Sequence, residues 1–268
     1  MKYGFIGTGC MGGALATACA KAIGPEDILL SNRSPEKAQA LAEKLGAIPA
    51  DNETITRDCD VIFLGVKPQT MAQMLLPLQP ILTGRRTPFV LVSMAAGVTI
   101  EALQDMAGGR YPVVRIMPNT ACAVGAGMTT YTCSAEVTDR QRQTVLDALA
   151  ASGLLEEIEE GLMGSASAVA GCGGAYACLF LEGLADGGVL CGLPRKKAQR
   201  MAAQMLLGMA TQALESDEHT GALKDAVSSP AGSTIAGIRK LESMSFRSAA
   251  MEAVIAAWER EREMQQQK

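Results

Sequence analysis

The chain has few of the residues on which acid–base and metal catalysis usually depend. Its 268 residues include a single histidine, and aromatic residues make up only 4% of the sequence. The eight cysteines form no CxxC pair and have no histidine at metal-ligand spacing, so no metal site is predicted. Most of the cysteines lie in apolar runs, where we expect small buried hydrophobic residues in a reducing cytoplasm. A histidine relay is equally disfavoured, because His219 lies in a polar stretch that is typical of an exposed loop.

The sequence also lacks an excess of positive charge. With 24 basic and 28 acidic side chains, its net charge is −4 at pH 7, which disfavours a nucleic-acid partner. The first residues read as a strand and a turn rather than a signal peptide. The longest nearly uncharged stretch, residues 161–181, is interrupted by five glycines, which disfavours a membrane-spanning helix. We therefore expect a cytoplasmic protein without a membrane partner.

Short apolar runs alternate with helical patterns through the first half of the chain. This alternation is typical of an α/β protein with a parallel sheet covered by helices on both faces. We predict strands at residues 3–6, 28–31, 61–66, 89–93, 113–117, 128–132 and 154–158. Helices are predicted at residues 11–22, 35–45, 70–82, 100–106 and 138–152. Ser34 followed by Pro35 indicates the start of one helix, and Gly46 indicates its end.

Strand patterns stop after residue 162, and helices are predicted at 174–191, 194–214, 234–242 and 246–264. The fold prediction is an N-terminal Rossmann-type, doubly wound and mostly parallel sheet, followed by a C-terminal all-helical dimerisation domain. The domain boundaries are 1–160 and 161–268. The helix at 174–191 is apolar nearly all round, so a second copy of the chain would cover it best. A self-contained monomeric bundle remains the alternative.

A glycine-rich turn follows the first predicted strand directly. Gly7, Gly9 and Gly12 form the pattern GxGxxG. The first glycine permits a tight turn, the second lets the backbone approach a pyrophosphate, and the third allows close packing of helix on strand. The free N–H groups of the helix point at the anion. We therefore predict a dinucleotide site with Ile6, Gly7, Thr8, Gly9, Cys10, Met11 and Gly12 as cofactor-binding residues.

The end of the second strand favours NADPH, with NADH as a weaker cofactor. An NAD site places an acidic residue there, whereas this chain has Asn32, Arg33 and Ser34. An arginine beside an amide and a hydroxyl suits a 2′-phosphate, although an ordinary capped turn remains the alternative. Ligands of open α/β sheets bind at the carboxyl ends of the strands. Two further loops are therefore predicted to border the cofactor: Val66, Lys67 and Pro68, and Ala95, Ala96 and Gly97.

Together these motifs resemble the pyrroline-5-carboxylate reductase family. The resemblance extends from about residue 3 to residue 262 and includes Arg115-x-Met117-Pro118-Asn119, residues 185–189, residues 192–195 and the segment from Leu223 to Thr234. It implies a helical domain that interlocks with a partner copy in a homodimer, and a higher oligomer of dimers stays open. It also implies reduction of the cyclic imine 1-pyrroline-5-carboxylate to L-proline by NADPH, the last step of proline biosynthesis.

The resemblance also assigns residues. In the family the substrate lies between the nicotinamide and the loop that here spans residues 229–234, near the dimer interface. Asn52 matches a family asparagine that contacts the cofactor. The resemblance implies substrate binding by Asn119, Ser229, Gly232, Ser233 and Thr234, with Thr234 as the catalytic residue.

The chemistry of the loop from Pro230 to Thr234 agrees with this assignment. The loop leads into a predicted helix, whose free N–H groups can hold a substrate carboxylate. An imine that is protonated in solution is already electrophilic, so hydride transfer needs mainly correct position. Thr234 would then orient the ring nitrogen rather than act as a strong acid. A capped turn without a ligand remains the alternative.

The chain departs from the family pattern in two places. Residues 170–176 read Ala-Gly-Cys-Gly-Gly-Ala-Tyr where the family commonly has Ser-Gly-Ser-Gly-Pro-Ala-Tyr. The usual Pro-Gly-Gly before the substrate threonine is here Pro230-Ala231-Gly232, and Ala231 is unfavourable if that position needs a positive φ. These changes leave the identity of the imine open.

Three alternatives therefore accompany the main hypothesis. The first is a reductase of another small cyclic imine. The second is a β-hydroxyacid dehydrogenase, which would use a lysine near the start of the helical domain, but no lysine occurs between Lys67 and Lys196. The third is a catalytically silent NADP-binding regulatory protein, against which the intact glycine turn and the 229–234 loop argue.

Overall fold

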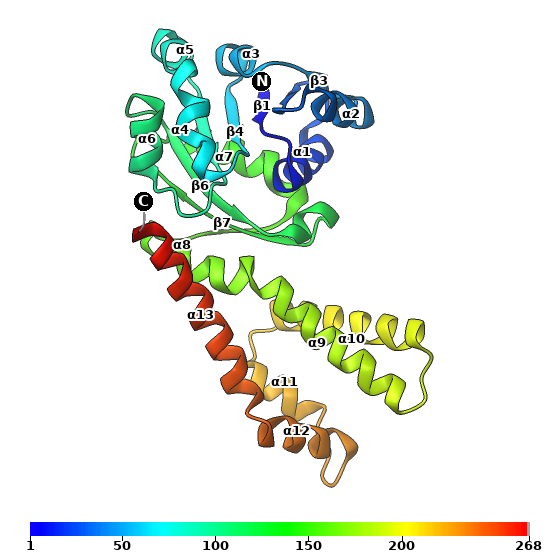
Figure 1. Ribbon diagram of the computed structural model, residues 1–268. Coiled ribbons are helices and arrows are strands. Elements are labelled where there is room, and N and C mark those ends of the chain that lie inside the picture. Colours follow the sequence, from blue (N-terminus) through cyan, green and yellow to red (C-terminus); the bar gives the residue numbers. More distant parts are fainter. Residues whose placement is uncertain (267–268) are drawn as a thin grey trace. The chain divides into compact units, whose positions relative to one another are not determined.

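The computed structural model describes residues 1–266 and contains one eight-stranded sheet (Figure 1). The strand order is β3-β2-β1-β4-β5-β6-β7-β8, and neighbouring strands are parallel except β6 and β7. The mostly parallel Rossmann-type sheet is thus confirmed. The strands are β1 (Tyr3–Ile6), β2 (Ile28–Ser31), β3 (Ile48–Pro49), β4 (Val61–Leu64), β5 (Val90–Ser93), β6 (Val113–Pro118), β7 (Gly127–Cys133) and β8 (Gly153–Glu157).

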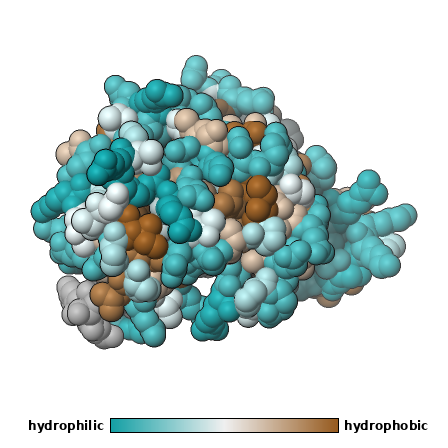
Figure 2. Space-filling view, turned by 90° about the horizontal axis from the view of Figure 1, so that it is seen from above, coloured by the Kyte–Doolittle hydropathy of each residue, from teal (hydrophilic) through white to brown (hydrophobic). Residues whose placement is uncertain are grey.

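Helices cover both faces of this sheet, because successive strand residues point to opposite faces and both sets are apolar. One face packs against α1 (Cys10–Ile23), α2 (Pro35–Leu45) and α7 (Asp139–Leu149). The other packs against α3 (Asn52–Asp58), α4 (Pro68–Leu75), α5 (Gln79–Gly84) and α6 (Ile100–Ala107). Apolar residues of the strands are therefore buried between the sheet and these helices. Hydrophilic residues predominate on the face shown in Figure 2, with separate hydrophobic patches between them.

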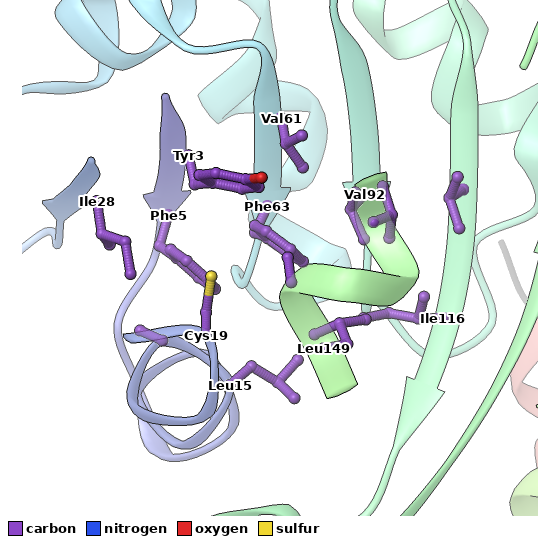
Figure 3. Close-up of a cluster of buried hydrophobic side chains, with 14 of the residues drawn as sticks. Tyr3, Phe5, Leu15, Cys19, Ile28, Val61, Phe63, Val92, Ile116 and Leu149 are labelled. Carbon is purple, nitrogen blue, oxygen red and sulfur yellow. The ribbon is translucent and has the colours of Figure 1, made fainter. Parts of the chain in front are cut away.

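Two stacked phenylalanines form the middle of the first core. Phe5 of β1 and Phe63 of β4 are paired in register, and their ring centroids lie 4.2 Å apart with planes 3° from parallel. Cys19 of α1 and Leu149 of α7 approach this pair from the helical layer (Figure 3). Both helices are thereby fixed against β1 and β4, the strands whose carboxyl ends carry the glycine turn and the Val66–Pro68 loop.

Proline and glycine account for the main differences from the predicted elements of the first half. The helix predicted at 70–82 is divided into α4, the 3-10 turn η1 (Leu76–Leu78) and α5, since Pro77 and Pro80 have no N–H to continue the ladder. The strand predicted at 61–66 ends at Leu64, just before Gly65. The short strand β3 was not predicted, because two exposed strand residues give no alternating pattern, and the seven-residue helix α3 was not predicted either.

The rest of the chain is helical, as predicted, although the helix at Thr220–Ala226 was not predicted. After β8 come η4 (Glu160–Leu162), α8 (Met163–Ala166) and the π-helical turn η5 (Ser167–Gly171). They are followed by α9 (Gly173–Leu190), α10 (Arg195–Glu215), α11 (Thr220–Ala226), α12 (Ser233–Ser243) and α13 (Phe246–Gln266). By packing, one compact unit comprises residues 1–171 with the end of α13 from Trp258, and the other comprises Cys172–Ala257. The domain division at residue 160 stays a prediction.

The second unit covers little of its own apolar surface. Its buried hydrophobic residues are Ala185, Ala198, Ala202 and Leu223. On α9, by contrast, Leu179 is 69% exposed and Leu190 is 89% exposed. The helical run Glu160–Leu190 is long and apolar enough to cross a membrane by length and composition alone, with 11% of its most apolar window buried. An apolar helix this exposed needs a further apolar surface to cover it.

The expectation that most cysteines are buried is wrong for half of them. Cys19, Cys59 and Cys122 are buried and Cys133 is half-buried, whereas Cys10, Cys172, Cys178 and Cys191 are exposed. Burial raises the pKa of the Cys19 and Cys59 thiols to about 12, so these two are unreactive core residues. Three of the exposed cysteines lie in the second unit, whose apolar faces are also uncovered. Within residues 1–266, no three histidine, cysteine or acidic side chains come together as potential metal ligands.

Candidate functional site

The glycine turn joins β1 to α1 through contacts that only glycine allows. Gly7 has a φ of 100°, and its N–H donates to the carbonyl of Ser31 at 2.9 Å. A Cβ on Gly12 would lie 2.1 Å from the carbonyl oxygen of Gly7. The turn is therefore pressed against the end of β2 on one side and against the first turn of α1 on the other.

Gly9 leaves the other side of this turn open. An ideal Cβ on Gly9 meets no heavy atom within 4 Å, and no side chain caps the first N–H groups of the 14-residue helix α1. Cys10 is exposed and Met11 half-buried in that first turn, while Ile6 and Thr8 are buried. An open backbone with free N–H groups at a helix N-terminus fits the pyrophosphate of a dinucleotide.

Asn32 connects the glycine turn to the next helix. Its Nδ2 donates to Thr8 Oγ1 at 3.1 Å, and its Oδ1 accepts from the Ser34 N–H at 3.2 Å. Ser34 is the N-cap residue of α2, but its hydroxyl makes no capping bond, so the helix-cap role expected for this side chain is wrong. Arg33 is exposed and bonds to none of the side chains that the structure describes. Both Arg33 and the uncapped start of α2 are therefore free to hold an anion.

Asn52 is brought to the same place from the start of α3. The Ser31 hydroxyl donates to Asn52 Oδ1 at 2.5 Å, which leaves the amide nitrogen of Asn52 free. A hollow of about 770 Å³ lies here, lined by residues that include Asn32, Asn52 and Asp51. Asp51 was not predicted as a site residue; hydrogen bonds from Thr54 lower the pKa of its carboxyl. A larger hollow of about 910 Å³ lies at the amino ends of β4 and β5, and no predicted site residue lines it.

The two other predicted cofactor loops follow the neighbouring strands β4 and β5. Lys67 is exposed at the start of α4, and Val66 and Pro68 are half-buried. In the second loop Ala95 is buried, Ala96 is exposed, and Gly97 has a φ of 69°. Because β1, β2, β4 and β5 are parallel, all these loops leave the same edge of the sheet.

Asn119 is occupied mainly by contacts within the first unit. Its Oδ1 accepts from the N–H groups of Ala121 at 3.2 Å and Met128 at 3.3 Å, and its Nδ2 donates to the carbonyl of Ala170 at 3.1 Å. One amide hydrogen is left for a ligand. Asn119 therefore holds η5 at Ala170, the first of the positions at which the sequence departs from the family pattern.

The predicted substrate loop lies in the second unit and forms a tight turn. The Gly232 N–H donates to the carbonyl of Ser229 at 3.1 Å, and Ala231 has a φ of 57°. The position thus needs a positive φ, as suspected from the sequence, and alanine occupies it under strain. Ser233 begins α12 without a side-chain cap, and both Ser233 and Thr234 are exposed. The free N–H groups of α12 are therefore available to a carboxylate.

His219 lies outside this loop. It is exposed at the start of α11, and its Nδ1 accepts from the Gly221 N–H at 3.0 Å. The ring thus has a local capping role at the start of α11, and the absence of a histidine relay stays a prediction.

Two family models match the chain. Residues 160–264 match the model described as "Pyrroline-5-carboxylate reductase dimerisation", and residues 2–97 match "NADP oxidoreductase coenzyme F420-dependent". The pyrroline-5-carboxylate reductase of Methanosarcina acetivorans is 39% identical over 266 residues, covering 98% of this chain and 97% of that protein. The Escherichia coli enzyme of the same name is 38% identical over 262 residues, covering 97% and 96%.

Solved structures agree over the same length. The chain superposes on Plasmodium falciparum pyrroline carboxylate reductase with NADP bound, with a TM-score of 0.87, 34% identity and coverage of 99% and 98% of the two chains. It superposes on pyrroline-5-carboxylate reductase from Coxiella burnetii with a TM-score of 0.90, 31% identity and coverage of 98% and 97%. The similarity therefore includes the helical second half as well as the nucleotide-binding half.

The two glycines of the turn should respond differently to alanine. Gly12→Ala places a methyl group 2.1 Å from the Gly7 carbonyl, so we expect a loss of about 1–3 kcal/mol in stability, seen as a lower Tm. Gly9→Ala meets nothing in the protein, so its Tm should stay within 2 °C (roughly 0.5 kcal/mol) of the wild type while the affinity for NADPH falls. An equal fall in Tm for both variants would contradict the open space beside Gly9.

Ala231→Gly should stabilise the chain. The substitution removes a left-handed alanine, which costs about 1–2 kcal/mol, against an entropic loss of about 0.5–1 kcal/mol. We expect a Tm about 2–4 °C higher at fixed protein concentration. The control is Ala236→Gly within α12, which should lower Tm; a decrease of similar size for Ala231→Gly would show that its φ carries no strain.

Proposed function

Because the chain belongs to the pyrroline-5-carboxylate reductase family, we propose that the loops described above carry out the family's reaction on this chain. The chain is an NADP-dependent oxidoreductase of proline biosynthesis, which reduces 1-pyrroline-5-carboxylate to L-proline with NADPH. The observation that carries this conclusion is identity of 35–39% to enzymes of this name over nearly the whole chain. When bound, NADPH supplies the hydride that reduces the carbon of the C=N bond.

In this proposal the cofactor lies along the carboxyl edge of the sheet. The turn of Ile6, Gly7, Thr8, Gly9, Cys10, Met11 and Gly12 holds the pyrophosphate with backbone N–H groups. Asn32, Arg33 and Ser34 surround the 2′-phosphate, and the free amide of Asn52 contacts the adenosine half. Val66, Lys67 and Pro68, together with Ala95, Ala96 and Gly97, border the nicotinamide. Support comes from the open side of Gly9 and from the unpaired Arg33 guanidinium.

The substrate part of the proposal uses the second unit. The uncapped N–H groups that Ser233 and Thr234 contribute to α12 hold the substrate carboxylate, and the turn from Ser229 to Gly232 fixes their direction. The Thr234 hydroxyl accepts a hydrogen bond from the protonated ring nitrogen and so orients the ring. Asn119 would contribute its remaining amide hydrogen. Since the imine arrives protonated, hydride addition alone completes the amine, and no strong acid or base is needed.

Self-association follows from the helical half of the chain. The family model that matches residues 160–264 is a dimerisation domain. The exposed apolar faces of α9 and its neighbours are the surface that a second copy of the chain would cover. We extend this proposal to an oligomer of dimers, for which exposed Met201, Leu214 and Met251 offer further apolar contacts. We also propose a cytoplasmic location, since four exposed free cysteines suit a reducing compartment.

A parallel assay tests the activity. Oxidation of NADPH is followed by the loss of its absorbance. The substrates compared are pyrroline-5-carboxylate, six-membered piperideine carboxylates and a hydroxyacid/ketoacid pair. We expect the five-membered imine to give the highest kcat/KM. Turnover of the six-membered imine alone would show that this imine is the substrate. Turnover of the ketoacid would favour the dehydrogenase alternative. Tight NADPH binding without turnover of any substrate would indicate a catalytically silent protein.

Arg33→Ala tests the 2′-phosphate site. Loss of a charge-assisted hydrogen bond costs about 1.5–3 kcal/mol, so the Kd for NADPH should rise about 10- to 100-fold while the Kd for NADH stays within about twofold. Lys44→Ala, an exposed cation in the last turn of α2, is the matched control and should change neither Kd. Equal losses for NADPH and NADH in Arg33→Ala would refute the role of this side chain.

A further inference from the structure

A buried arginine lies beside the loop that follows β5. Arg115 on β6 is only 3% exposed and is level with Ser93, the last residue of β5. Its Nη1 lies 3.0 Å from Glu160 Oε1, and its Nε has no hydrogen-bond partner among the described residues. The Glu160 side chain of this pair is 35% exposed, so the ion pair is only half-buried. Such a pair adds little net stability compared with apolar side chains, so stability alone does not account for the buried arginine.

The same oxygen of Glu160 makes a second contact. It accepts a hydrogen bond of 2.7 Å from the backbone N–H of Ile100, the first residue of α6. Ile100 comes three residues after Gly97 in the loop that borders the nicotinamide in the proposed function. At its other end this loop is attached to the sheet, where the Ala95 N–H bonds to Ser93 Oγ at 3.4 Å. Glu160 therefore anchors the end of the loop that the sheet does not hold.

A second carboxylate completes the cluster from α13. The Glu261 side chain has a buried Oε1 that has no hydrogen-bond partner among the residues the structure describes. Burial raises the pKa of Glu261, while the Ser167 hydroxyl and the charge of Arg115 act against that rise. Arg115 thus faces two acidic groups, of which Glu160 takes the direct ion pair.

We propose that Glu160, held by Arg115, is a positioning residue for the nicotinamide end of the cofactor. By fixing the N-terminus of α6, Glu160 determines how closely the Ala95–Gly97 loop approaches the nicotinamide ring. The proposal rests on the proposed function only in taking this loop as the nicotinamide border. A displacement of about 1 Å at a reacting centre can lower a rate roughly 100-fold, so a carboxylate that touches neither reactant can still control the hydride transfer.

The test separates the two halves of the cofactor. Kd values are measured for NADPH and for 2′,5′-ADP, which lacks the nicotinamide, in Glu160→Ala, in Glu160→Gln and in the exposed neighbour Glu159→Ala. We expect Glu160→Ala to raise the Kd for NADPH about tenfold and to leave 2′,5′-ADP within about twofold, because only the nicotinamide border has moved. Glu160→Gln keeps an oxygen for the Ile100 N–H, so its Kd for NADPH should lie between those of the wild type and Glu160→Ala. Both Kd values of Glu159→Ala should match those of the wild type.

Turnover gives the second readout. With pyrroline-5-carboxylate, Glu160→Ala should lower kcat about 10- to 100-fold and leave the KM for the imine nearly unchanged. Equal losses for NADPH and 2′,5′-ADP, or unchanged binding of both, would overturn the proposal. If Glu160→Ala does not fold, the same comparison in Glu160→Gln decides. If the wild type reduces no cyclic imine, the proposed function fails while the two Kd values still test the role of Glu160.

Discussion

The close approach of three glycine backbones is the constraint on which the nucleotide half of this protein depends. A Cβ on Gly12 would lie 2.1 Å from the Gly7 carbonyl oxygen, and a Cβ on Gly65 would lie 2.3 Å from the same atom. Both distances are shorter than any real contact, so α1 can begin directly above β1 and beside the end of β4 only if these positions have no side chain. The same absence brings the N-terminus of α1, with its uncapped N–H groups, to the carboxyl edge of the sheet.

The loops around this turn are joined to their neighbours by neutral or paired polar groups. Asn32 joins the glycine turn to α2, Asn119 joins β6 to η5, and Glu160 joins Arg115 to α6. Asn32 and Glu160 each fix a loop that the proposed function places against the cofactor, and Asn119 is itself proposed to contact the substrate. This arrangement suits the reduction of a protonated imine, for which position matters more than proton transfer.

The helical half depends on a different constraint, the covering of apolar surface. With four buried hydrophobic residues in Cys172–Ala257, a single chain does not form a core of ordinary density there. The membership of the chain in a family with a dimerisation domain explains why α9 is apolar nearly all round. It also explains why an 18-residue window of this region passes as a membrane span by composition.

The sequence by itself determined those features whose cause is local. The GxGxxG turn, the alternation of strands and helices, the Asn32–Ser34 segment and the strain at Ala231 all follow from residues a few positions apart. The tertiary structure alone decided which distant groups meet: Ser31 with Asn52 across 21 positions, Arg115 with Glu160 across 45, and Ile100 with Glu160 across 60. It likewise left Ser34 without a capping bond and four cysteines exposed. The physical reason is that the order of strands in the sheet and the packing of helices on it bring these residues into contact. Both depend on the whole chain, so no single segment of the sequence predicts the contacts.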